Sequence, residues 1–432
     1  MPKILKWLSP ARIIALGFVF VILLGSLLLS LPCCVRDGVT VRYIDTLYTS
    51  ASAVCVTGLV AVDPGDTFTP LGQIVLALLI QIGGLGVTAV GTGVILAMGK
   101  KLSLKGRSVV REAMNLDSGK GVVRFLKSVF LTTITIELCG AVLSFCVFAR
   151  DYPPLRALWI SLFHSVASFN NSGFDVLGGG QSLIPYRENL LLNLITCALI
   201  FLGGIGFLVI REILAKRFRW KRFSMHTKVV LSFSVVLIAA GTVLLRLTEG
   251  IPWLGALFQS VSARTAGFAT YPIGGLSNAG LIVMLCLMFI GASPGSTGGG
   301  VKTTTVFALI QGIQSAATNR AEKGFRYAMP REAFRKAAVI TLIALGVILT
   351  GTFLMCAMEP ALSIRDILFE VVSAFGTVGL STGVTAQLGV GSKLLSIVIM
   401  YIGRLGPMTI ALLWYFSNGE RVRYPEGNLA IG

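Results

Sequence analysis

The chain has 432 residues, of which 54% are hydrophobic and 13% are charged. Soluble domains carry about 25% charged residues, so the composition excludes an ordinary soluble enzyme or binding module. Apolar runs of about 18 residues or more recur along the chain and indicate a membrane protein with several spans. The first run, residues 13–31, has no small-residue cleavage site followed by a polar mature region, so we expect a retained helix and not a removed signal peptide.

The net charge of +18 at pH 7 does not indicate nucleic-acid binding, because the basic residues gather in particular loops. These loops lie at residues 100–127, 211–228 and 320–336, and further basic residues stand near both ends of the chain. The positive-inside rule places all five segments on the cytoplasmic side, so we expect both termini there. The same loops are also suited to contact with anionic membrane lipid.

One pattern of segments occurs four times between the basic loops. Each unit has an apolar helix, a shorter amphipathic stretch, a glycine-containing loop and a second apolar helix. The first helices are expected at residues 12–31, 125–148, 228–247 and 337–358, and the second helices at 71–98, 189–214, 279–314 and 393–416. We assign the units to residues 1–99, 100–220, 221–318 and 319–432, the second with its preceding cytoplasmic loop and the fourth with the C-terminal tail. Internal repetition of this kind is a strong fold signal.

The segments between the two helices of a unit are too short to cross a membrane. Residues 43–54 measure about 18 Å as a helix, against a hydrocarbon core of about 30 Å. Residues 154–168, 252–263 and 363–374 are similar, and each must enter and return on the outer side because the next basic loop is again inside. The sequence therefore predicts an all-α polytopic membrane protein. Its four tandem helix–pore-loop–helix repeats surround a pseudo-fourfold pore, with eight transmembrane helices and four re-entrant pore helices.

Each return loop contains a glycine followed by a large apolar residue. Glycine there lets the backbone take a positive φ and turn carbonyl oxygens toward an axis, where they replace the hydration shell of K⁺. One such pair would indicate only a turn, but four in equivalent positions favour an ion filter. The predicted filter residues are Val56, Thr57, Gly58, Asn171, Ser172, Gly173, Thr265, Ala266, Gly267, Thr377, Val378 and Gly379.

A glycine-rich run interrupts the second helix of the third unit. A Walker A nucleotide loop does not fit, because Val301 separates Lys302 from the last glycine and no strand precedes the run. A plain helix kink remains an alternative. We expect a mobile loop below the filter, since Gly, Ser, Pro and Thr free the backbone to unwind. The candidate residues of this region, together with the arginine described next, are Gly291, Ala292, Ser293, Pro294, Gly295, Ser296, Thr297, Gly298, Gly299, Gly300, Lys302 and Arg404.

The second helices carry related glycine motifs at similar distances from the filter glycines. These motifs begin 25, 30, 24 and 24 residues later, at Gly83, Gly203, Gly291 and Gly403. Arg404 stands in the fourth motif, and a guanidinium within an apolar helix marks a functional site. It is expected to form a barrier just inside the filter, with a buried ion pair as the alternative. The roles of Glu137, in a span, and Asp175, beside the second filter loop, stay open.

These motifs resemble those of the Trk/Ktr/HKT superfamily of potassium transporters, and most closely the Ktr-type (KtrB-like) ion-translocating membrane subunit. The most specific segments are residues 171–174, 265–268 and 291–303, and the resemblance covers essentially the whole chain. It implies a filter with one glycine from each repeat, where four glycines accompany potassium preference. It also implies that the broken segment and Arg404 form an intramembrane gate in a transporter for potassium uptake across the plasma membrane of a prokaryote.

The resemblance further implies partners and a transported ion. The expected assembly is a homodimer on a cytoplasmic ring of nucleotide-binding, RCK-type (KtrA-like) regulatory subunits, with the tail at residues 424–432 reaching a dimer neighbour. K⁺ is the expected transported ion, a Na⁺ dependence stays open, and a nucleotide is expected only on the regulatory partner. A sodium-permeable or sodium-coupled cation transporter is the nearest alternative. A membrane enzyme acting on lipid is more remote, because the sequence shows no catalytic cluster of His, Glu and Asp.

Overall fold

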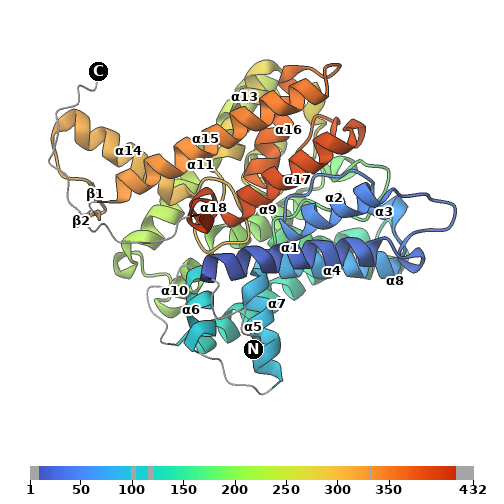
Figure 1. Ribbon diagram of the computed structural model, residues 1–432, viewed down its shortest axis with the longest axis horizontal. Helices are drawn as coiled ribbons and strands as arrows, with labels where there is room; N and C mark the ends of the chain where they lie inside the picture. The colour runs from blue at the N-terminus through green and yellow to red at the C-terminus, as the bar shows by residue number, and fades with distance from the viewer. Residues whose placement is uncertain (1–8, 99–103, 115–120, 331, 415–432) are drawn as a thin grey trace.

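The computed structural model describes residues 9–98, 104–114, 121–330 and 332–414, whose regular secondary structure is almost entirely helical (Figure 1). The predicted tail contact of residues 424–432 lies outside these residues. Within them the only strands are β1 (Lys323–Gly324) and β2 (Tyr327–Ala328), which pair antiparallel. The long first helices of the units are α1 (Pro10–Leu29), α7 (Val122–Phe148), α11 (Met225–Glu249) and α15 (Ala333–Met358). Each of the four is long and apolar enough to cross a membrane.

Four short helices occupy the places predicted for the pore helices. They are α2 (Tyr43–Val54), α8 (Pro154–Phe169), α12 (Trp253–Ser262) and α16 (Ile364–Gly376). Their starts follow ordinary helix-capping chemistry. Pro154 is the first residue of α8, Pro252 precedes α12, and the Ser363 side chain accepts a hydrogen bond from the Asp366 backbone N–H. The prediction of four short helices, one per unit, is confirmed.

The second helices differ from the sequence prediction, because all four are broken and not only the third. The segments are α4 (Pro70–Leu85) with α5 (Val87–Ala97), α9 (Leu190–Ile205) with α10 (Phe207–Ala215), α13 (Asn278–Phe289) with α14 (Thr303–Thr318), and α17 (Val390–Leu405) with α18 (Pro407–Trp414). The first two pairs bend by 99° and 98°. Gly86, Gly206 and Gly406 stand at the breaks with φ of 88°, 91° and 87°. A right-handed helix cannot continue through a residue with such a φ.

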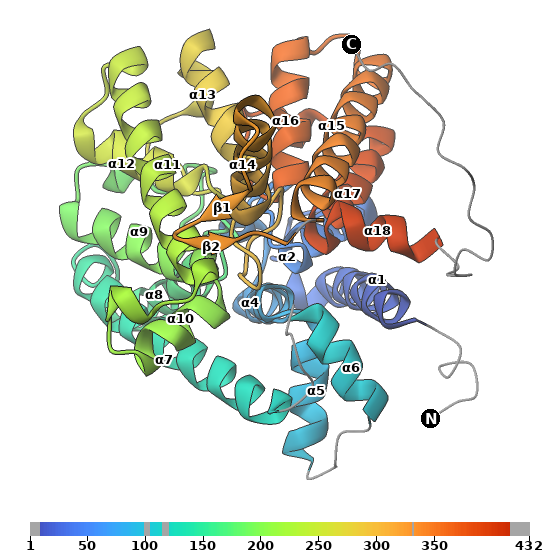
Figure 2. The same ribbon diagram turned by 90° about the vertical axis from the view of Figure 1, so that its left-hand side faces the viewer.

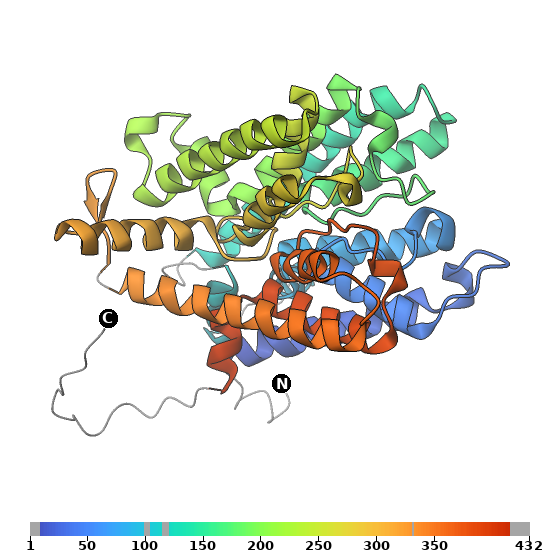
Figure 3. The ribbon, with the colours of Figure 1, turned by 90° about the horizontal axis from the view of Figure 1, so that it is seen from above.

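Short elements connect these helices. They are η2 (Pro32–Cys34), α3 (Pro64–Thr67), η3 (Ile184–Tyr186), η4 (Trp220–Arg222), η5 (Ile273–Gly275) and η6 (Thr385–Gln387) on the loops, and α6 (Leu104–Ala113) between the first two units. Helix α6 packs against α1 and α5 (Figure 2). Helix α14 and the β1–β2 hairpin extend toward one end of the molecule (Figures 1 and 3).

The units follow one another around a centre in chain order (Figure 2). The second helix of each unit contacts the pore helix of the next: α4 contacts α8, α9 contacts α12, α13 contacts α16, and α17 contacts α2. The last contact returns to the first unit and closes the circle. The cyclic repeat architecture is therefore present, with the pore helices on the inside.

The same local packing recurs within the units. A pore-helix serine donates its hydroxyl to a carbonyl of the first helix in three of them: Ser50 to Ile22 at 2.7 Å, Ser165 to Glu137 at 2.6 Å and Ser260 to Ile238 at 2.9 Å. The motif glycines Gly83, Gly203 and Gly403 lie directly against the C-terminal carbonyls of Val54, Phe169 and Phe375, so closely that a Cβ atom would not fit. This contact explains why a glycine follows three of the four filter loops at a similar distance, whereas Gly291 of the third unit meets the Gly299 carbonyl instead.

Candidate functional site

The four predicted filter glycines lie next to one another in a closed ring. Their φ angles are 88°, 70°, 83° and 96°, all in the left-handed region. Each glycine leaves no room for a Cβ atom because a backbone carbonyl of the following unit stands there: Gly58 faces Ser172, Gly173 faces Ala266, Gly267 faces Val378, and Gly379 faces Thr57. The structure thus brings all four loops to one axis, whereas their role as a potassium filter stays a prediction.

A second left-handed residue precedes each ring glycine by two positions. All four are predicted filter residues, but sequence reasoning missed their conformation. These residues are Val56, Asn171, Thr265 and Thr377, with φ of 56°, 57°, 82° and 51°. Such a conformation costs a non-glycine residue about 1–3 kcal/mol, and residues of this kind cluster at functional sites. No sequence signal marks this left-handed conformation, because none of the four residues is glycine and only Asn171 is of a type that favours it.

The backbone N–H groups of the loops bond to the ends of the pore helices. Thr57 N–H donates to the Ser52 carbonyl at 2.7 Å, and Val378 N–H donates to that of Ser373 at 2.9 Å. The hydroxyls of the same two serines accept from Gly58 at 3.0 Å and Gly379 at 3.1 Å. Among the described residues, no hydrogen bond to the carbonyl oxygens that precede the ring glycines occurs. The loops therefore leave backbone oxygens free to meet a cation.

The ring forms the floor of a cavity of about 380 Å³, which Asp63 and Asp175 also line. We call it the outer cavity, after the topology that the basic loops predict. Asp63 and Asp66 accept hydrogen bonds from Gly180 N–H at 2.6 Å and Gly179 N–H at 2.7 Å, and so fasten the outer loop of the second unit to the first. Burial and the nearby charges of Asp63 and Asp66 raise the pKa of Asp175 to about 7. Of these carboxyl groups, that of Asp175 lies nearest in sequence to a ring glycine.

Residues 290–302, which we call loop 290–302, connect α13 to α14 directly below the ring. Gly298 packs against the Thr265 side chain, and Gly299 N–H donates to the Thr377 hydroxyl at 2.9 Å. The loop also bonds to the second unit through Ser293 N–H to Gly204 O at 3.0 Å and Thr297 N–H to Gly203 O at 3.2 Å. These bonds hold the loop against the second and fourth units.

Two basic side chains bind the carbonyls of this region. Arg404 donates to Thr297 O in loop 290–302, and to Gly83 O at 2.5 Å and Gly84 O at 3.2 Å in the first unit. Lys302 donates to Gly298 O at 2.7 Å. None of the ion pairs within the described residues includes Arg404. Its contacts are with backbone carbonyls, in contrast to the ion-pair alternative.

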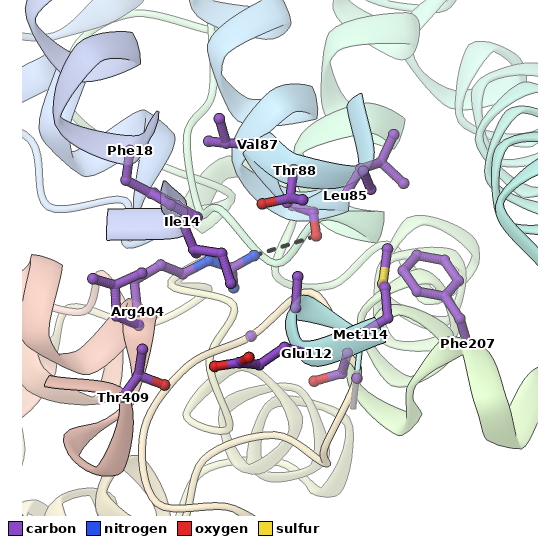
Figure 4. A pocket seen from close by; sticks show the side chains of 18 of the residues that line it. Ile14, Phe18, Leu85, Val87, Thr88, Glu112, Met114, Phe207, Arg404 and Thr409 are labelled. Atoms are coloured by element: carbon purple, nitrogen blue, oxygen red, sulfur yellow. Dashed lines mark hydrogen bonds between the residues drawn. The ribbon is translucent and has the colours of Figure 1, made fainter. Parts of the chain in front are cut away.

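An inner cavity of about 170 Å³ lies on the far side of the loop, lined by Arg404, Lys302 and residues of α1, α5 and α6. Figure 4 shows Arg404 reaching into it, with Glu112 and Met114 from the end of α6 beside it. The ring and loop 290–302 thus lie between the outer cavity and the inner cavity. Four short helices that end at a ring of backbone carbonyls are an arrangement typical of membrane ion channels and transporters.

The chain belongs to the TrkH family of cation transport proteins, which it matches over residues 18–418. It is 36% identical over 445 aligned residues to the Ktr system potassium uptake protein B of Bacillus subtilis, covering 100% of this chain and 99% of that protein. It is 38% identical over 451 residues to the potassium/sodium uptake protein NtpJ of Enterococcus hirae, with the same coverage.

The fold is also similar to a solved structure. The crystal structure of the potassium transporter TrkH from Vibrio parahaemolyticus superimposes with a TM-score of 0.74 at 19% identity, covering 95% of this chain and 86% of that one. At this identity the likeness concerns the fold alone. The resemblance stated from the motifs is confirmed at the level of the family.

Proposed function

We propose that this protein mediates potassium uptake across the plasma membrane of a prokaryote, with both termini in the cytoplasm. The observation that carries the proposal is the closed ring of Gly58, Gly173, Gly267 and Gly379 with free carbonyl oxygens beside it. Such oxygens can replace the hydration shell of K⁺. The pore helices end at the ring, so their partly negative C-termini favour a cation there. The predicted filter residues of each loop supply these oxygens.

Loop 290–302, Lys302 and Arg404 form the gate in this proposal. The loop lies beneath Thr265 and Thr377, and two basic groups stand beside it. A cation leaving the ring toward the cytoplasm meets this loop and its positive charges. Transport requires the loop to leave its bonds with the second and fourth units, while the ring keeps its shape. Selectivity and rate therefore belong to different parts of the site.

Control of the gate is proposed to come from outside the chain. Relatives carry the name of a Ktr system, which supports a membrane subunit that works with a regulatory partner. We propose a homodimer on a cytoplasmic ring of nucleotide-binding subunits, with the nucleotide bound by the partner and no cofactor in this chain. The cytoplasmic end of α14, which begins at the gate, is a suitable point for such control.

The test is flux of ⁸⁶Rb⁺ into liposomes that contain the purified protein, with K⁺ or Na⁺ as competitor. Selective potassium uptake predicts that K⁺ suppresses the tracer at concentrations where Na⁺ does not. Equal suppression by both ions would instead favour the second candidate, a sodium-permeable transporter, which the potassium/sodium name of the Enterococcus relative supports. Absence of flux in both the presence and absence of the regulatory partner would contradict both.

A further inference from the structure

Glu137 is the one carboxyl group among the four residues that occupy equivalent positions in the first helices of the units. Its backbone carbonyl accepts the pore-helix serine bond that recurs in three units, where the equivalent acceptors are Ile22 and Ile238. The same position in the fourth unit, three residues before the glycine that faces the pore helix, is Ile348. Three units thus place isoleucine where the second places a carboxyl group.

The Glu137 side chain is buried in an apolar span, with only 6% of the residue exposed. Its carboxylate accepts a hydrogen bond from the side-chain amide of Asn170 at 2.9 Å. The same amide nitrogen also donates at 2.9 Å to the side-chain oxygen of Gln81 in α4 and at 2.9 Å to the Val166 carbonyl of α8. Gln81 hydrogen-bonds the carboxyl group of Glu137 as well. Three polar groups from α4, α7 and α8 therefore meet behind the second loop.

Asn170 connects this cluster to the ring. It caps the C-terminus of α8 and is followed directly by Asn171, which takes the left-handed conformation, and then by Ser172 and Gly173. On its other side, Asn170 packs against Gly84, whose carbonyl accepts from Arg404. The direction in which the second loop leaves its pore helix thus depends on how Asn170 is held.

Direct contact between Glu137 and a passing ion does not fit its place. Glu137 lines neither the outer cavity nor the inner cavity. Simple packing does not account for it either, because burying a carboxyl group in an apolar span is costly and isoleucine fills the equivalent space in three units. The feature that can explain a carboxyl group at this position is therefore its hydrogen bond with Asn170.

We propose that Glu137 is a positioning residue for ion selectivity, which orients the second filter loop by accepting the hydrogen bond of Asn170. This inference rests on the proposed function, since it assigns a specificity role behind the same ring. The loop carbonyls of the second unit keep their distance from the axis only while Asn170 is held from α7 and α4. Without the acceptor, the loop is free to rotate, and the ring discriminates less between K⁺ and Na⁺.

The test compares Glu137→Gln with Glu137→Ile in the liposome flux assay with Na⁺ competition. Glutamine keeps an acceptor oxygen, so E137Q is expected to stay within about twofold of the wild-type K⁺ over Na⁺ preference. Isoleucine matches the other units but accepts no bond. E137I is expected to lose about tenfold in preference, the scale of one buried hydrogen bond, when equal amounts of folded protein are compared. Leu138→Ile, at an exposed neighbouring position, is the control and should leave the preference unchanged.

A double variant tests whether Glu137 and Asn170 affect ion preference through the same interaction or independently. If Glu137 acts through Asn170, then E137I combined with Asn170→Leu is no worse than the stronger single variant. Should E137I fail to fold, Gln81→Leu removes another partner of the same amide and takes its place. The inference is wrong if E137I keeps the wild-type preference, or if E137Q loses as much as E137I. If the wild-type protein itself showed no preference for K⁺ over Na⁺, the result would contradict the proposed function.

Discussion

The ring glycines combine a left-handed backbone with a contact that leaves no room for a Cβ atom. Gly38 has a similar φ of 80°, but nothing lies within 4 Å of its Cβ position. The two positions therefore separate backbone strain from contact across the ring. At Gly58 the obstacle is the carbonyl of Ser172, which belongs to the neighbouring loop.

Gly58→Ser is expected to relax the preference for K⁺ over Na⁺, because the added side chain pushes the Ser172 carbonyl out of the ring. The loss should be about tenfold or more, since one displaced ligand is worth more than one ordinary hydrogen bond. The measurement is ⁸⁶Rb⁺ flux with Na⁺ competition. Gly38→Ser is the matched control and should keep the preference. If both variants lost the K⁺ over Na⁺ preference equally, backbone strain and not the contact across the ring would be the cause.

Asp175 gives the outer cavity a charge that depends on pH. Its pKa of about 7 means that the carboxyl group is neutral in acid and becomes negative as the pH rises through neutrality. A negative group in the cavity raises the local cation concentration. Flux at low K⁺ should therefore rise between about pH 6 and pH 8 and become flat in Asp175→Asn. A wild-type dependence that survives in the variant would exclude Asp175 as its source.

At the scale of elements, loop 290–302 is held by bonds that differ from those of the ring. Thr377 belongs to a filter loop by position, yet its hydroxyl accepts from Gly299 N–H. Thr377→Val keeps the branched shape and removes the acceptor, so the flux rate should increase severalfold while ion preference is retained. Thr377→Ser keeps the hydroxyl and should resemble wild type. A change in preference without a change in rate would contradict the separation of filter from gate.

Arg404 fixes the same loop from the fourth unit through Thr297 O. Arg404→Ala removes this bond and the positive charge, so the rate of uptake should increase severalfold with little change in ion preference. Single-channel or liposome flux recordings measure both quantities. Arg365→Ala removes an arginine that also binds carbonyls, those of Gly274 and Leu276 on the outer side, and serves as the control. An unchanged rate in R404A would remove Arg404 from the gate.

The sequence predicted the elements unevenly, and the reason is physical. Length and flanking residues locate a pore helix, and the observed bounds of α2 equal the predicted ones. The breaks at Gly86, Gly206 and Gly406 were missed, because a glycine in an apolar run is compatible with a straight helix and only its φ shows otherwise. The ring glycines were predicted from fourfold repetition. The contacts of Arg404 and Asn170 cross between units and have no signature in local sequence.

At the scale of the whole molecule, the circle closes where the fourth unit meets the first. Lys393 of α17 and Asp45 of α2 form a buried ion pair at 2.7 Å, with side chains 1% and 7% exposed. Tyr48 and Ser396 share a hydrogen bond at 3.1 Å beside it. Although burial raises it, hydrogen bonds from Lys393 and Arg42 hold the pKa of Asp45 below its ordinary value. The stability from this group is therefore present above that ordinary value and is lost as pH falls through the lowered one.

Lys393→Met is expected to lower the free energy of unfolding by about 3 kcal/mol, the lower end for breaking a buried pair, since Arg42 still pairs with Asp45. Thermal unfolding in detergent at neutral pH measures the loss. The double variant Lys393→Met with Asp45→Asn should recover most of it, because no unpaired charge is left buried. A single variant as stable as wild type would show that the pair contributes little to this closure.

The contact between α17 and α2 also sets an order of events during synthesis. Consecutive units are tethered by peptide loops, but the joint between the last and the first has no covalent bridge. On the ribosome, α2 emerges early, and Asp45 has only Arg42 as its partner until Lys393 is made. The four units therefore cannot close their circle until nearly all of the protein has been translated, and a chain that stops after the third unit lacks the contacts of α16 with α13 and of α17 with α2.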